Sequence, residues 1–137
     1  MMTPELTVLA LAALLQCAQF VLMAALVNLE VGPAKTMSPR DPDRMGGPLA
    51  DQVSPRTGRL VRALNNHFES LILFAIAVTV LTFGDRSTGL SGVLAWVYLG
   101  ARVLYVPAYY YGLVPWRSLI WGVGWGVTVL LLLMAVV

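Results

Sequence analysis

The stretch from Leu6 to Leu29 constrains the fold of this chain more than any other feature, because it contains no charged side chain. At about 24 residues and 1.5 Å per residue, a helix over it is roughly 36 Å long, enough to cross a bilayer. Thr3-Pro4-Glu5 precedes it with an N-cap residue, a proline suited to the first turn and an acid. It has no basic leader and is too long for the apolar part of a signal peptide, so we expect a retained first span.

The composition also indicates a membrane protein. Hydrophobic residues make up 58% and charged residues 12% of the 137 positions, against about 45–50% and 25% in soluble domains. A net charge of +2, dispersed along the chain, does not suggest a nucleic-acid surface. The single cysteine, Cys17, excludes an intramolecular disulfide, and no metal-ligand spacing is present.

Three more apolar segments follow a loop rich in proline, glycine and charge. The pattern therefore predicts one all-α domain, a four-helix transmembrane bundle embedded in a lipid bilayer. The loop is long enough that we expect it to pack over something or to carry function. The expected spans cover residues 4–29, 58–83, 88–111 and 115–137, and the loop covers 30–57.

The distribution of basic residues predicts the orientation. The long loop contains four of them, whereas the turn between the second and third spans contains only Arg86. The positive-inside rule places the long loop in the cytoplasm and both termini outside. The four basic residues of the loop are Lys35, Arg40, Arg44 and Arg56.

Polar residues stand on one face at the start of the second span. Arg62, Asn66 and Glu69 are spaced at i, i+4 and i+7, so they form one stripe on a helix. They reach roughly 6, 12 and 16 Å into the membrane at 1.5 Å per residue. Ionisable groups at such depths cost roughly 2.5–3.5 kcal/mol each, so a site inside a helix bundle is the default hypothesis.

The third span carries a matching stripe at the same end of the membrane. Tyr109, Tyr105 and Arg102 lie at roughly 3, 9 and 14 Å by the same measure. Because Glu69 and Arg102 have opposite charges at nearly the same depth, we predict that they pair. The turn into the fourth span brings two further residues to the rim, Arg117 and Ser118.

Each of these residues has a plainer interpretation. Arg62 is shallow enough to snorkel to the headgroups, and Arg117 follows Trp116 at a helix start where interfacial anchors are common. Glu69 and Arg102 are also compatible with a purely structural ion pair, and the three consecutive tyrosines 109–111 with an aromatic belt. The convergence of all of them at one end favours a site.

The remaining polar and small residues receive weaker interpretations. His67 points about 100° away from Asn66 and has no ligand partner at metal spacing, so we expect no metal role. Gly122 and Gly126, flanked by Trp121 and Trp125, indicate a helix-packing face. Arg59, Asn65 and Ser70 are further candidates for the rim.

The order and spacing of the polar residues resemble those of a known family, the membrane-associated proteins in eicosanoid and glutathione metabolism (MAPEG). The matching pattern covers nearly the whole chain. The sequence of the loop from Pro39 to Gly47 looks most like that of the bacterial branch. A bacterial member would lie in the inner membrane, with its termini in the periplasm. The pattern reads Arg62-x-x-x-Asn66-x-x-Glu69, then Arg102-x-x-Tyr105-x-x-x-Tyr109, then Arg117-Ser118.

The resemblance implies a homotrimer with a glutathione site between neighbouring protomers, near the cytoplasmic side. Glu69 would bind the glutathione amino group, and Arg102 would support Glu69. Arg117 would stabilise the thiolate, with Ser118 as a secondary catalytic candidate. The carboxylates and backbone of glutathione would be held by Arg62, Asn66 and Tyr109, with Tyr105 as a further contact.

The leading functional hypothesis is a membrane glutathione transferase or peroxidase that acts on lipophilic electrophiles or hydroperoxides. The alternative is a non-catalytic membrane protein that binds lipid or fatty acid, since the family contains such a member. The direction of Arg117 separates the two, because only a side chain that faces the pocket suits thiolate chemistry. A four-helix exporter ranks last, since it needs an acid midway along the first span and none occurs between Glu5 and Glu30.

Overall fold

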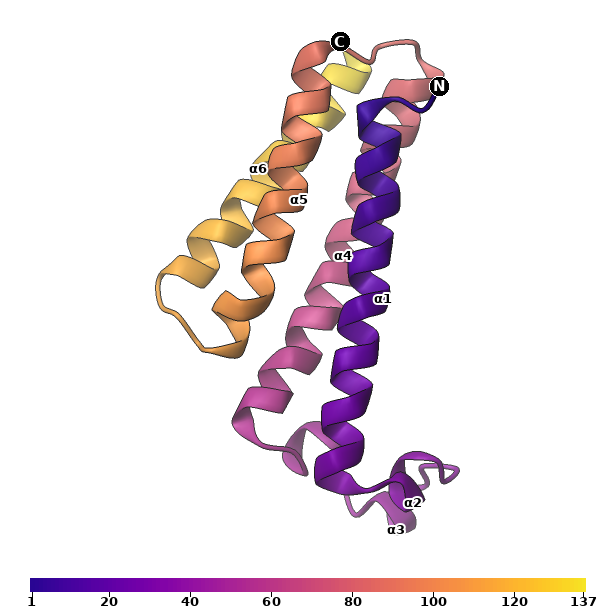
Figure 1. Ribbon diagram of the computed structural model, residues 1–137, viewed down its shortest axis with the longest axis vertical. Coiled ribbons are helices and arrows are strands. Elements are labelled where there is room, and N and C mark those ends of the chain that lie inside the picture. Colours follow the sequence, from indigo (N-terminus) through magenta and orange to yellow (C-terminus); the bar gives the residue numbers. More distant parts are fainter.

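Four long helices make up most of the protein (Figure 1), in a computed structural model that describes residues 1–137. All four are long and apolar enough to cross a membrane. The predicted all-α, four-span architecture is therefore confirmed. The long helices are α1 (Pro4–Val31), α4 (Pro55–Phe83), α5 (Gly89–Tyr110) and α6 (Trp116–Val136), and the loop holds α2 (Pro33–Thr36), α3 (Pro42–Met45) and the 3₁₀ turn η1 (Leu49–Asp51).

Short polar side chains cap the starts of α1 and α4. Thr3 accepts a hydrogen bond from the Leu6 backbone N–H, as expected for an N-cap, and Pro4 opens α1. Ser54 caps α4 in the same way, so this helix begins at Pro55, three residues before the expected start of the span. The fourth long helix begins at Trp116, one residue after the proline expected to open it.

The helices run antiparallel to their chain neighbours, with both termini at one end of the bundle and the loop at the other (Figure 1). α1 packs along α4, α5 packs along α6, and α4 also contacts α5 and α6. α1 and α4 have 28 and 29 residues, whereas α5 and α6 have 22 and 21. The two longer helices therefore extend beyond the α5–α6 turn at the loop end (Figure 1).

The apolar core lies in the half of the bundle nearer the termini. Phe74 of α4 stacks on Tyr98 of α5, with ring centroids 3.9 Å apart and planes within 3°. At the terminal end, buried Glu5 of α1 accepts a hydrogen bond from Ser91, which belongs to the N-terminal capping box of α5. The core residues are Val8, Ala12, Phe74, Ala77, Val78, Leu81, Ala95, Tyr98, Val127, Leu131 and Ala135.

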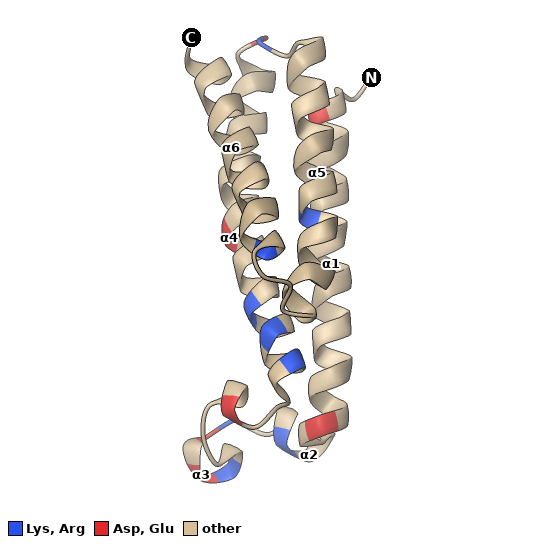
Figure 2. Ribbon diagram, turned by 90° about the vertical axis from the view of Figure 1, so that its left-hand side faces the viewer, with Lys and Arg blue, Asp and Glu red and all other residues tan.

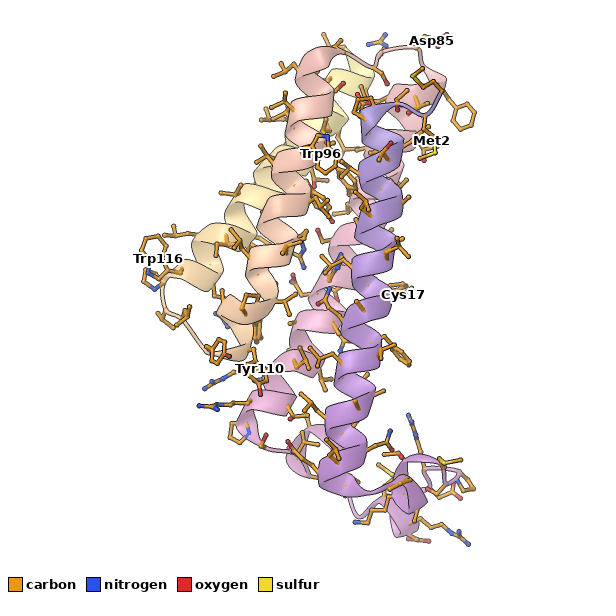
Figure 3. The ribbon with its side chains drawn as sticks, viewed as in Figure 1. Met2, Cys17, Asp85, Trp96, Tyr110 and Trp116 are labelled. Carbon is orange, nitrogen blue, oxygen red and sulfur yellow. The ribbon has the colours of Figure 1, made fainter.

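The outer surface of the bundle is apolar, as a membrane-spanning protein requires. Leu14, Ile72 and Val103 are among many large hydrophobic side chains that are exposed, and such faces are stable against lipid rather than water. Cys17 also points away from the other helices (Figure 3) and is exposed. The chain is thus a multi-pass membrane protein.

The loop packs against the end of α1, as its length predicted. Glu30 accepts hydrogen bonds from the Ser54 backbone N–H at 2.5 Å, the Ser54 hydroxyl at 2.9 Å and the Thr57 hydroxyl at 2.6 Å. Thr36 donates to Asn28 of α1, and Met45 of α3 is buried. These contacts fix the start of α4 beside the end of α1.

Candidate functional site

A cavity of about 420 Å³ opens near the loop end of α4, beside the α5–α6 turn. Basic residues of α4 lie in the half of the helix nearer the loop (Figure 2). Of the site residues predicted from the sequence, all except Arg102 line this cavity. Its lining consists of Arg62, Asn65, Asn66, Glu69, Tyr105, Tyr109, Arg117, Ser118 and Trp121.

Tyr109 is the central side chain of the cavity. The Arg62 Nε donates to the Tyr109 hydroxyl at 3.3 Å. The guanidinium carbon of Arg62 lies 5.9 Å from the centroid of the Tyr109 ring, and that of Arg117 lies 4.9 Å away. One ring on α5 therefore brings together cations from α4 and α6 by cation–π attraction.

Arg117 lines the cavity and is partly buried. Trp116, one residue earlier, is exposed at the start of α6, across the α5–α6 turn from Tyr110 (Figure 3). Adjacent helical residues point about 100° apart, so Trp116 points away from the cavity that Arg117 lines.

Tyr105 and Arg102 form the buried side of the site. Tyr105 is buried and meets Tyr109 edge to face, with centroids 5.4 Å apart and an interplanar angle of 70°. The guanidinium carbon of Arg102 lies 4.6 Å from the Tyr105 ring centroid. The aromatic stripe predicted on α5 thus separates the deep arginine from the cavity.

The predicted ion pair between Glu69 and Arg102 was wrong. Arg102 is only 2% exposed and its Nη2 donates instead to Oδ1 of Asn66, at 3.1 Å. Glu69 remains exposed. Pairing would require the carboxylate to enter the bundle, and the loss of its hydration opposes that movement, whereas the neutral Asn66 amide meets the guanidinium at a smaller desolvation cost.

Arg102 faces a second, smaller cavity of about 250 Å³ between α4, α5 and α6. Asn66, Glu69 and Trp121 line both cavities, so the two spaces are neighbours. The second cavity is lined by Asn66, Glu69, Ser70, Leu73, Arg102, Trp121, Trp125, Thr128, Val129 and Leu132.

The sequence interpretation placed Arg117 and Ser118 of α6 at the site but missed Trp121, which lines both cavities. Trp121 was assigned to helix packing, yet it stands at i+4 from Arg117, a spacing that places both on one face. An added Cβ at Gly122 or Gly126 would meet no other helix within 4 Å, so the predicted packing role of these glycines does not hold within one chain. At Gly124, by contrast, an added Cβ would lie in contact with Arg102, 3.6 Å from its Cδ.

The three further candidates for the rim, Arg59, Asn65 and Ser70, lie in three different places. Asn65 lines the larger cavity, and Ser70 lines the smaller one, with its hydroxyl 2.9 Å from that of Tyr98. Arg59 lines neither; its Nη1 donates to the Tyr110 carbonyl at 3.4 Å, under the α5–α6 turn.

His67 contacts α1 rather than the site. Its Nδ1 lies 3.0 Å from the side-chain nitrogen of Gln19, and both residues are buried. No three His, Cys, Asp or Glu side chains are close enough together to hold a metal ion.

The linings of the two cavities offer guanidinium, carboxylate, amide and phenol groups. This set of groups suits a zwitterionic organic ligand.

Comparison with known proteins identifies the family of the chain. A family model described as the MAPEG family matches residues 8–137. The chain belongs to this family. A search of curated proteins found no match. MAPEG proteins are membrane proteins associated in general with eicosanoid and glutathione metabolism, and the match extends over all four long helices.

Proposed function

We propose that this MAPEG protein is a glutathione-dependent transferase or peroxidase that acts on lipophilic electrophiles or hydroperoxides. The observation that carries the proposal is the position of Arg117, which lines the same cavity as Arg62, Glu69 and Tyr109. A guanidinium in this position favours chemistry over lipid binding alone, because it keeps its charge and attracts a thiolate.

The cavity suits glutathione in charge and in size. Glutathione carries two carboxylates, one ammonium group and a thiol, and its carboxylates match the guanidinium groups. Arg62 would bind a carboxylate with Asn66 and the Tyr109 hydroxyl, and Glu69 would bind the ammonium group. The volume of about 420 Å³ lies within the range of small-molecule sites.

Arg117 would act on the sulfur. A nearby cation favours the thiolate over the thiol and so raises the concentration of the nucleophile. In transfer, the thiolate sulfur bonds to the electrophilic carbon and the leaving group departs with its electron pair. In reduction, two glutathione molecules become a disulfide while a hydroperoxide becomes an alcohol and water. Ser118, at the exposed edge of the cavity, is a secondary hydrogen-bond donor.

The open side of the cavity supports a homotrimer. Arg62, Glu69 and Ser118 are exposed, and no residue of α1 lines the cavity. A neighbouring protomer placed against this face would close the site and bury the charged stripe of α4. Lipophilic substrates would then reach the sulfur from the bilayer. We assign the loop end to the cytoplasmic face of a bacterial inner membrane, with periplasmic termini, because basic residues concentrate there.

Calorimetry of glutathione binding to the full-length protein in detergent tests the proposal. We expect the wild type to bind with millimolar affinity or better, Glu69→Gln to abolish binding, and Arg117→Ala to bind without the ultraviolet absorbance of a thiolate. Arg86→Ala, outside both cavities, is the matched control and should behave as wild type.

Two outcomes would contradict the proposal. A wild-type trimer that binds no glutathione would leave the alternative of a lipid- or fatty-acid-binding MAPEG protein without chemistry. Binding that persists in Glu69→Gln would place glutathione elsewhere. The mass of the detergent-solubilised particle, measured in the same samples, shows whether the trimer is intact.

A further inference from the structure

A layer of polar side chains crosses the interior of the bundle beside the larger cavity and shares only Asn66 with its lining. Gln19 of α1 and His67 of α4 are 3% and 1% exposed, and the Gln19 amide nitrogen donates to Nδ1 of His67 at 3.0 Å. Asn66, the next residue along α4, accepts from Arg102 of α5. Three helices therefore contribute polar groups at one level.

The layer extends one helical turn further from the loop. Gln16 stands at i−3 from Gln19, on the same side of α1. Ser70 stands at i+3 from His67, and its hydroxyl is 2.9 Å from that of Tyr98. The polar layer thus occupies about two turns between the site and the apolar core.

Several buried atoms of this layer have no hydrogen-bond partner in the protein. An unpaired buried polar group is unfavourable, and native proteins pair nearly all of them with protein atoms or ordered water. Here the unpaired groups come from three helices and lie within the two turns that the layer occupies. They are Oε1 of Gln16, Oε1 of Gln19, Nε2 of His67 and Nε of Arg102.

The hydrogen-bonding character of these atoms defines the missing partner. Because Gln19 donates to Nδ1, a neutral His67 carries its proton on Nε2 and is a donor there. Arg102 Nε is also a donor, whereas the two glutamine oxygens are acceptors. The partner must both donate and accept hydrogen bonds, which a simple cation or anion does not do.

The partner beside Gln19 and His67 must also be small, because neither residue lines either cavity of the candidate site. Among Gln19, His67 and Arg102, only Arg102 borders the cavity of about 250 Å³. The guanidinium of Arg102 disfavours a cation at this level, and a protonated His67 would add a second buried positive charge. Globular proteins hold roughly one buried water per 27 residues, typically with two to four polar partners, so a few waters suit a chain of this size.

We propose that ordered water molecules occupy this layer and join the Gln16 and Gln19 oxygens to the N–H groups of His67 and Arg102. The water ties α1 to the buried arginine that holds Asn66 of the site. This hydrated site does not depend on what the larger cavity binds.

The test uses the single histidine of the chain. Full-length protein without a polyhistidine tag, labelled with ¹⁵N-histidine and placed in lipid nanodiscs, gives NMR signals from His67 alone. We expect a protonated Nε2, an unprotonated Nδ1, and magnetisation transfer between water and the Nε2 proton. A proton on Nδ1, protons on both nitrogens, or an Nε2 proton without contact to water would each overturn the proposal.

A pair of variants tests the connection to α1. Gln19→Leu removes the donor to Nδ1, so the Nδ1 signal should shift and the transfer from water should change. Ala18→Leu, the matched control, adds the same side chain at the exposed neighbouring position and should leave the spectrum unchanged. A wild-type spectrum from Gln19→Leu would overturn the proposal, and if that variant does not fold, the wild-type spectrum alone decides.

Discussion

The guanidinium of Arg117 stands over the ring of Tyr109, 4.9 Å from its centroid, at the mouth of a cavity that both residues line. Arg62 donates to the hydroxyl of the same tyrosine. Through this one side chain, α5 brings the first charged residue of the α4 stripe close to the start of α6.

Substitution of Tyr109 should weaken glutathione binding in two steps. Tyr109→Phe keeps the ring but loses the hydroxyl that Arg62 contacts, so we expect a loss of about 1 kcal/mol, roughly fivefold in Kd. Tyr109→Leu also removes the cation–π contacts and should bind roughly tenfold or more weakly than wild type. Calorimetry measures the Kd of glutathione for both variants. Tyr111→Leu, exposed and outside the cavity, is the control. Equal Kd values for all three variants would contradict the role of the ring.

Gly124 should tolerate only small side chains. An added Cβ would lie 3.6 Å from Arg102 Cδ, an ordinary contact, so Gly124→Ala should fold normally. Gly124→Leu overpacks this position, and we expect a loss of about 1–3 kcal/mol in the free energy of unfolding. Thermal unfolding in detergent measures the change.

Gly122→Leu is the matched control for this prediction, because no atom of the protomer lies within 4 Å of an added Cβ there. A loss in Gly122→Leu as large as in Gly124→Leu would show that Gly122 packs against another protomer. That result would contradict the prediction that only Gly124 is sensitive to a larger side chain.

Gln19 and His67 should be coupled in stability. His67→Leu leaves the Gln19 amide buried without its partner, so we expect roughly 1–3 kcal/mol of destabilisation. The double variant Gln19→Leu/His67→Leu should lose less than the sum of the single losses, with a coupling of roughly 0.5–3 kcal/mol. Thermal unfolding of the four proteins gives the cycle. Additive losses would show that the two side chains do not interact.

Glu30 should hold the first turn of α4. Glu30→Gln replaces a carboxylate that accepts from Ser54 and Thr57, so the start of α4 should open more often. Trypsin should then cleave after Arg56 several times faster than in wild type, as followed by mass spectrometry. Asp51→Asn, an exposed carboxylate of the same loop, is the control. Unchanged cleavage in Glu30→Gln would mean that other contacts hold this end.

Much of the site was predictable because its residues share a helix face and an end of the membrane. The stripe of Arg62, Asn66 and Glu69 follows from i, i+4 and i+7 spacing alone. The placement of Arg117 and Tyr109 at the same rim follows from the antiparallel order of four spans. Trp121 was predictable by the same rule, as one turn after Arg117, but its apolar ring favoured a packing interpretation.

The sequence by itself determined the number of spans, the polar stripe and the end of the bundle at which polar groups gather, because apolar length and helical spacing are local properties. Only the tertiary structure decided which side chains meet. Arg102 contacts Asn66 instead of Glu69, and Gln19 contacts His67. These choices depend on how far each helix is rotated about its axis and on the register of α1 against α4. Packing against other helices sets both quantities, and no spacing within one helix encodes them.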